Sequence, residues 1–131
     1  MSSLFDSTVD VLSKSLDLYL LRHAVISDNI ANAETPHFKA RKVEFETQLQ
    51  NAISAGETGG GDEAVSREIA SVKPAVAHDL ESEMGLDLNT VDMDREMAAM
   101  TKNDIKYTAA TQAVQKKFAL LRYAISDGGE R

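Results

Sequence analysis

Histidines are the first residues to consider for chemistry, because imidazole binds metal ions and exchanges protons near neutral pH. The chain has three of them, His23, His37 and His78, in separate segments. None belongs to an H-E-x-x-H pattern, in which two histidines one helical turn apart hold zinc. A zinc site would need distant segments to converge, so we predict no metal site and expect His23 to be an interface residue on an apolar helix face.

Carboxylates gather in one short run that could in principle hold a divalent cation. The run consists of Asp79, Glu81, Glu83 and Asp87. It lacks the glycine and the oxygen-ligand spacing of a calcium-binding loop. A solvated acidic surface is the better interpretation.

Other catalytic signatures are missing from the sequence. The glycines at 59–61 are not followed by the Lys-Ser or Lys-Thr of a phosphate-binding loop, and there is no nucleophile elbow. The absence of cysteine excludes disulfides and thiolate chemistry. We therefore predict a protein that is not an enzyme and has no catalytic residue, cofactor or metal.

Composition indicates one small helical domain. Among the 131 residues, 5% are aromatic, and only seven glycines and two prolines interrupt the chain, which favours helices over short strands. The net charge of -7 argues against a nucleic-acid partner. The sequence has no long apolar run and no basic N-terminal region followed by an apolar core, so we expect neither a membrane span nor a cleaved signal peptide.

Two long helices must position most of these side chains, and the first is predicted from Ser3, a candidate N-cap, to residue 33. It should end before Thr35 and Pro36, because proline breaks helical geometry. Its apolar positions alternate by four and three residues, as in a coiled coil. These positions are Phe5, Val9, Leu12, Leu16, Tyr19, His23, Ile26, Ile30 and Ala33.

The second long helix is predicted from near Val91 to Asp127, after the capping-type residues Asn89, Thr90 and Asp92. Its seam shows the same alternation of four and three residues. The seam consists of Met93, Met97, Met100, Asp104, Tyr107, Thr111, Val114, Phe118, Leu121 and Ile125. We interpret its methionines as packing surface rather than a metal site.

Each long helix also has a second apolar line on another face. In the first helix the line is Leu4, Val11, Leu18, Leu21 and Val25. In the second it is Ala98, Ile105, Ala109, Ala113, Leu120 and Ala124. One partner helix cannot cover two faces, so either several neighbours pack on these helices, or the extra apolar residues are scattered on the surface of an intramolecular hairpin. Periodicity leaves both interpretations open.

The residues between the long helices predict a small irregular region. A short helix is expected over 45–53, a flexible glycine-rich stretch over 54–62, and an extended segment over 68–76, which contains Pro74. The predicted fold is mainly α: two long terminal helices paired as a coiled-coil-like hairpin, with an irregular middle that can contain a short helix and short extended segments. The expected parts are 1–35, 36–90 and 91–131.

One stretch, residues 27–39, resembles the SNNIANxxTPGYK motif of the bacterial flagellar rod and hook proteins. The matching residues are Ser27, Asn29, Ile30, Ala31, Asn32, Thr35, Pro36 and Phe38. Asparagines at 29 and 32 can hydrogen-bond backbone groups where the helix ends, and an aromatic side chain at 38 can fold back onto it. Further similarity covers residues 4–46 and 87–126. His37 and Leu88 depart from the family, which has glycine at both positions, so the turns there are expected to be altered.

The resemblance implies a structural subunit of the proximal rod, exported by the flagellar type III apparatus without a cleaved signal peptide. Such a subunit resides in the periplasmic rod of the basal body, polymerises through its terminal helices and transmits torque from motor to hook. The implied partners are further copies, the rod subunits FlgC and FlgF, the adaptor FliE and the export gate. The predicted seam contacts in assembly are Leu12, Leu16, Ile26, Ile30, Tyr107, Val114, Phe118, Leu121 and Ile125. The alternative is a helical-hairpin adaptor that never polymerises.

Overall fold

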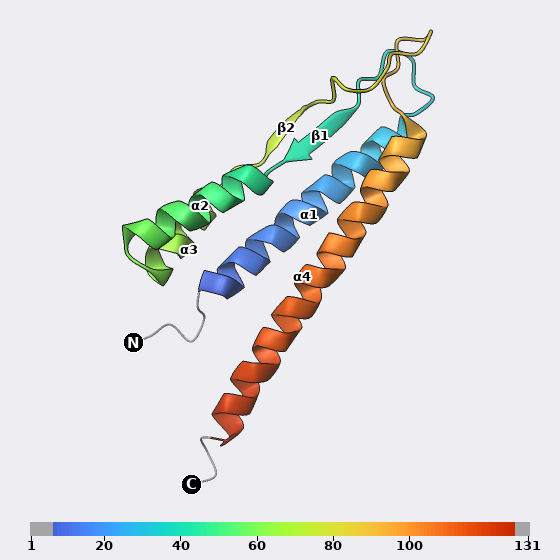
Figure 1. Ribbon diagram of the computed structural model, residues 1–131. Coiled ribbons are helices and arrows are strands. Elements are labelled where there is room, and N and C mark those ends of the chain that lie inside the picture. Colours follow the sequence, from blue (N-terminus) through green and yellow to red (C-terminus); the bar gives the residue numbers. More distant parts are fainter. Residues whose placement is uncertain (1–6, 128–131) are drawn as a thin grey trace.

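The computed structural model describes residues 7–127, which form helices and one pair of short strands (Figure 1). In chain order the elements are α1 (Ser7–Ala31), β1 (Arg41–Glu44), α2 (Glu46–Gly59), α3 (Asp62–Ser71), β2 (Ala75–His78) and α4 (Met93–Asp127). The predicted mainly α fold with two long terminal helices is confirmed. The predicted start at Ser3 and the apolar positions Leu4 and Phe5 lie outside the described residues.

Helix α1 is the central layer of three, as Figure 1 shows. Helix α4 runs antiparallel along one side of α1, and the region from β1 to β2 lies along the other side. Because α4 has 35 residues and the described part of α1 has 25, α4 extends beyond the start of α1 at the end away from the connecting loops. The predicted hairpin is therefore present, with a third layer that periodicity did not place.

The hydrophobic core lies between α1 and the middle region. Leu18 and Val25, from the second apolar line of α1, are buried in one cluster with side chains from β1 to α3. The cluster partners include Val43, Phe45, Ala52, Val65, Ile69 and Val72. Apolar burial of this kind stabilises the fold by about 1.5–3 kcal/mol for each large aliphatic side chain. Within the described residues, the middle region thus covers Leu18 and Val25 of the second line, and Val11 and Leu21 pack against the same cluster while partly buried.

The interface between α1 and α4 is covered less completely. Ile26 is buried on α1 and Ala110 on α4, and buried Asn103 donates its Nδ2 to the carbonyl of Tyr19 over 3.0 Å. His23 Nδ1 lies 3.1 Å from Asp104 Oδ1 at the exposed edge. The first seam of α1 is thus divided: His23 and Ile26 lie toward α4, whereas the Tyr19 ring packs edge-on against Phe45 in the core cluster, with 5.4 Å between the ring centroids. No helix between residues 7 and 127 combines the length with the hydropathy that a membrane span requires.

The middle region is more regular than predicted. The stretch 54–62 was expected to be a flexible loop, but α2 continues to Gly59 and only Gly60 and Gly61, with φ of 135° and 87°, turn the chain into α3. A Cβ on Gly56 would lie 2.3 Å from the Cα of Val65, so this glycine allows α2 and α3 to pack closely. The glycines thus form a tight helical hairpin rather than a flexible segment.

The extended prediction over 68–76 is only partly correct. Helix α3 runs to Ser71, and the strand β2 begins one residue after Pro74. Strand β2 pairs antiparallel with β1, with Arg41 opposite His78 and Glu44 opposite Ala75. Proline precedes the paired residues and so removes no ladder hydrogen bond.

Candidate assembly site

Asn29 fixes the end of α1 to the strand β1. Its side chain is fully buried, and its Nδ2 donates to the carbonyl of Arg41 over 2.7 Å while its Oδ1 accepts the Arg41 N–H over 3.0 Å. The amide therefore pairs with one backbone unit as another strand would. An ion pair between Arg41 and Asp28 joins the same two elements.

Asn32 and Thr35 close the helix end, as the sequence predicts for residues of these types. Asn32 Nδ2 donates to the carbonyl of Asp28 over 2.8 Å, and Thr35 Oγ1 donates to Asn32 Oδ1 over 3.1 Å. The exposed Pro36 follows and prevents a further helical turn. Ser27 and Ile30 are half-buried near the helix end, and Ala31 is exposed.

Asn89 joins the segment that precedes α4 to the end of α1 by hydrogen bonds. Its buried Nδ2 donates to the carbonyls of Asn32 and Thr35 over 2.9 and 2.7 Å. Its Oδ1 accepts the N–H of Val91 over 2.7 Å. The sequence predicts only a capping role for Asn89. Nothing in the local pattern indicates hydrogen bonds to residues more than fifty positions earlier in the chain.

Further backbone bonds tie the two connecting segments together. The Thr90 N–H donates to the carbonyl of half-buried Phe38 over 3.1 Å, and Thr90 Oγ1 accepts the Ala40 N–H over 2.9 Å. Lys39 Nζ donates to the carbonyl of Leu88 over 2.7 Å. We call residues 28–41 together with 87–91 the junction. Nearly all of the polar groups of the junction that are described above form hydrogen bonds or ion pairs within the chain.

The two departures from family glycines keep the backbone conformation that glycine favours. His37 has φ of 63° and Leu88 has φ of 64°. The expectation that these turns would be altered is wrong for the backbone. A left-handed residue with a Cβ costs about 1–2 kcal/mol, and surrounding bonds, such as that from the His37 N–H to the Asp87 carbonyl at 3.0 Å, hold it in place.

Helix α4 begins on an aspartate cap. Asp92 Oδ1 accepts the N–H groups of Asp94 and Arg95 over 3.1 and 3.2 Å, which satisfies donors that a helix start leaves unpaired. The predicted capping role of Asp92 is confirmed.

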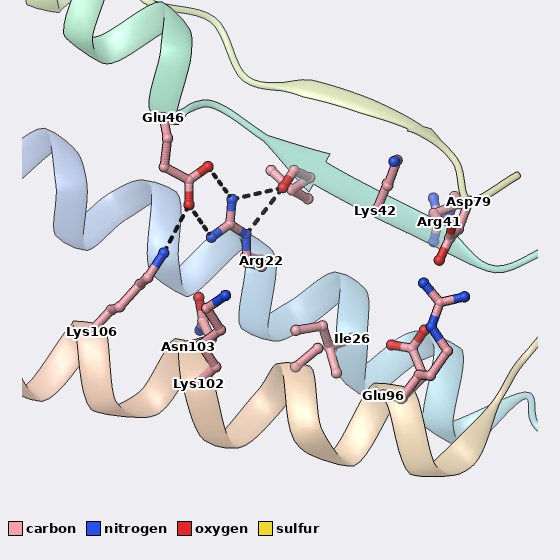
Figure 2. A pocket seen from close by; sticks show the side chains of 13 residues that line it. Arg22, Ile26, Arg41, Lys42, Glu46, Asp79, Glu96, Lys102, Asn103 and Lys106 are labelled. Carbon is pink, nitrogen blue, oxygen red and sulfur yellow. Dashed lines mark hydrogen bonds and ion pairs between the residues drawn. The ribbon is translucent and has the colours of Figure 1, made fainter. Parts of the chain in front are cut away.

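A polar cleft of about 250 Å³ lies between α1, β1 and α4 (Figure 2). Arg22 is one of the residues that line it. Its guanidinium donates to both oxygens of Glu46 over 2.7 Å and to the carbonyl of Val43, and lies 4.3 Å from the centroid of the Phe45 ring. Lys106 from α4 donates to the same carboxylate over 3.2 Å. Hydrogen bonds from Arg22 lower the pKa of Glu46 from 4.5 to about 2. Glu46 thereby connects all three layers.

Two further groups in this cleft are acceptors. Asn103 is 2% exposed, and its Oδ1 has no hydrogen-bond partner among residues 7–127. Burial and the charge of Asp79 raise the pKa of Glu96. In the part of the chain that the structure describes, no three histidine, aspartate or glutamate side chains converge as metal ligands would. The cleft is a set of internal ion pairs and hydrogen bonds that joins the helices.

The predicted seam residues fall into two groups. Ile26 is buried, and most of the others are half-buried; these are Leu12, Leu16, Ile30, Tyr107, Val114 and Leu121. Phe118 is 45% exposed and Ile125 is 68% exposed, toward the far end of α4. On the opposite face of α4, Ile105, Leu120 and Tyr123 are exposed as well. The structure therefore leaves apolar side chains uncovered at both ends of α4, since Met93 and Met97 near the junction are 42% and 51% exposed as well.

Curated relatives decide which family these features belong to, and no family model matches the chain. A Borrelia hermsii protein is 34% identical over 94% of this chain and 98% of its own length. A Bacillus subtilis protein is 30% identical over 96% and 98%, and a Salmonella typhimurium protein is 31% identical over 78% and 80%. Each is named flagellar basal body rod protein FlgB. The chain belongs to the FlgB family.

The similarity to FlgB proteins extends beyond the motif. With more than nine-tenths of the chain aligned to the Borrelia hermsii and Bacillus subtilis proteins, the matched region includes the middle layer as well as the junction. Sequence resemblance had covered only 4–46 and 87–126. Membership in the FlgB family therefore applies to the whole architecture.

Proposed function

We propose that this protein is a structural subunit of the proximal rod of the flagellar basal body. It polymerises through its terminal helices and transmits torque from motor to hook. The observation that supports the proposal best is the set of uncovered apolar side chains on two faces of α4, which includes Ile105, Leu120 and Ile125, in a chain whose relatives are named basal body rod proteins.

Physical chemistry supports polymerisation through this surface. Covering one large aliphatic side chain contributes about 1.5–3 kcal/mol, and several such side chains along one helix favour association. The middle region already covers Leu18 and Val25 on the second line of α1, so the apolar surface available to neighbours includes that of α4 and of the loop before it. The junction holds α1 and α4 at a fixed relative position, which a subunit that transmits torque requires.

The protein acts in this proposal as a scaffold without enzymatic activity. Its neighbours are other copies, the rod subunits FlgC and FlgF, the adaptor FliE and the export gate. It reaches the periplasmic rod through the flagellar type III apparatus without losing a signal peptide. Support for these partners and this route comes from membership in the FlgB family.

Cryo-electron tomography of basal bodies tests the proposal. In a strain that lacks the gene, we expect basal bodies without a rod, and we expect the wild-type gene to restore rods and motility. A complementing variant with Leu120→Ser and Ile125→Ser should fold but fail to restore the rod, whereas Gln50→Ser, on the exposed face of α2, should restore it. Complete rods in a strain without this gene or any paralogue would favour the adaptor that never polymerises.

A further inference from the structure

The loop before α4 presents apolar side chains to solvent in an ordered conformation. Leu80 and Leu86 are almost fully exposed, and Met84 is more than half exposed. The Glu81 N–H donates to Asp79 Oδ1 over 3.0 Å, and the N–H of Gly85 donates to the carbonyl of Asn89 over 2.8 Å. Because internal bonds fix the loop, binding through it costs little ordering entropy.

The same loop is strongly acidic. Residues 79–87 contain four carboxylates and no basic residue. Glu81 pairs with Arg95 over 3.2 Å, but Glu83 makes no hydrogen bond or ion pair with any residue between 7 and 127. We call residues 79–87 the acidic loop.

The body of α4 carries the opposite charge. Residues 98–126 contain five basic residues and one acidic residue, Asp104. The basic residues are Lys102, Lys106, Lys116, Lys117 and Arg122. Lys116 and Arg122 are exposed and form no ion pair within the described chain. Exposed Leu120 and Tyr123 share a face with Lys116, and exposed Ile125 lies on the seam face of the same segment. We call residues 116–125 the basic end of α4.

These two surfaces cannot meet within one molecule. The acidic loop leads directly into the start of α4, and the basic end lies at the other end of that helix (Figure 1). At about 1.5 Å per residue, the rise from residue 93 to residue 116 is about 35 Å.

We infer that the acidic loop of one copy docks on the basic end of α4 of a second copy, a contact that rests on the proposed polymerisation and names its two surfaces. Apolar side chains on both sides supply buried area, and opposite charges fix the orientation. Charge complementarity favours a second copy as occupant, since molecules with a net charge of -7 repel unless opposite surfaces face each other. A contact between two different patches is head-to-tail, and such contacts generate rings or helical filaments.

Cysteine cross-linking in basal bodies tests the contact, because the natural sequence has no cysteine. A chain with both Leu86→Cys and Tyr123→Cys, expressed as the sole copy and treated with a short bis-maleimide, should give a ladder of covalent multimers. Each single variant should stay monomeric. The matched control chain carries Val76→Cys in place of Leu86→Cys and keeps Tyr123→Cys. Val76 is an exposed position on β2, and this control should give no ladder.

A charge exchange provides the second measurement. Glu83→Lys, added to the two-cysteine chain, should lower the multimer fraction by about fivefold, as loss of a surface ion pair does at most, and a further Lys116→Glu should restore it. Circular dichroism of each purified variant should give an unchanged thermal midpoint, since both residues are exposed and make no ion pair within the described chain.

The outcomes separate this inference from the proposed function. A ladder that Glu83→Lys weakens and Lys116→Glu restores supports the contact. Homodimers of the Leu86→Cys variant, or products with a flagellar protein of another mass, overturn the contact between copies. Basal bodies that contain the chain but yield no ladder also overturn it, while leaving the proposed function intact. Basal bodies that lack the chain overturn both.

Discussion

The junction and the basic end of α4 lie at opposite ends of one helix and have opposite properties. At the junction, buried Asn29, Asn89 and Thr90 pair with backbone groups of distant segments. At the basic end, apolar Leu120 and Ile125 are two-thirds exposed, with cations around them. The first surface is completed within the chain, and the second offers apolar area and charge to another molecule.

Loss of a side chain should therefore affect folding at the junction and assembly at the basic end of α4. When a buried polar group loses its hydrogen-bond partner, the folded state is destabilised by the full desolvation free energy of that group. When a buried apolar group is removed, it leaves a cavity. An exposed side chain costs almost nothing in the monomer. Substitutions at matched buried and exposed positions should therefore have clearly different effects on stability.

The largest effect on stability is expected from the core that supports the junction. Leu18→Ala should lower the free energy of unfolding by about 2–5 kcal/mol, because Leu18 is buried and its removal leaves a cavity. Leu20→Ala, two residues along α1 and exposed, should change it by about 0.5 kcal/mol or less. Urea denaturation of the purified chain measures both, and equal losses would show that the layers are not packed as described.

Asn29→Ala should have the next largest effect, a loss of about 2–3 kcal/mol, because both backbone groups of Arg41 lose their partner. Asn51→Ala is the matched control on the exposed face of α2 and should leave stability nearly unchanged. The same denaturation experiment compares them. A loss below about 0.5 kcal/mol for Asn29→Ala would mean that the junction does not hold α1 to β1.

The ion pairs of the cleft predict a loss of stability in acid. The folded pKa of Glu46 is about 2, below its ordinary value of 4.5, so its contribution is present above pH 4.5 and disappears as the pH falls toward 2. The wild type should lose about 1 kcal/mol relative to Glu46→Gln over this window, a value reduced for the half-exposed carboxylate. Parallel pH profiles of unfolding would contradict the role of Glu46.

Replacing Leu88 by glycine should stabilise the protein by about 1 kcal/mol, because glycine adopts φ of 64° without strain. Leu86→Gly, at a position without positive φ, should give no gain, since it only adds freedom to the unfolded chain. Thermal unfolding compares the two variants. Destabilisation by Leu88→Gly would show that the leucine side chain, and not its backbone conformation, matters to the junction.

The smallest effect on folding is expected at the basic end. Ile125→Ser should change the free energy of unfolding by about 0.5 kcal/mol or less, because Ile125 is 68% exposed, yet it should reduce swimming in soft agar. Ile26→Ser, at a buried position of the same seam pattern, should instead unfold the chain. Full motility with Ile125→Ser would remove this residue from the assembly surface.

Local sequence signals were sufficient for the long helices and their ends. The alternation of four and three residues located α1 and α4, Pro36 marked the end of the first helix, and Asp92 marked the start of the second. These signals act within one or two turns, so they require no knowledge of the rest of the fold. The motif at 27–39 could also be recognised from the sequence, because its order of residues is specific.

The structure of the middle region was not predicted correctly from local sequence preferences, for a physical reason. Glycines at 56 and 59–61 are typical of flexible loops, yet here one permits close packing of α2 on α3 and two others form the turn. A glycine that favours a loop locally can favour a helix hairpin when a partner lies against it. Whether these glycines form a loop or a helix hairpin depends on tertiary contacts, which override local conformational preference.

The two long helices, their apolar lines and the family of the protein could be predicted from the amino-acid order, because periodicity and motif order are local properties of the chain. Which apolar side chains are covered by the middle region and which stay exposed became known from the tertiary structure. It alone also showed that Asn89 bonds to the end of α1, and that His37 and Leu88 keep a glycine-like backbone. Burial and long-range hydrogen bonds depend on which distant segments meet, and no local pattern of residues specifies that meeting.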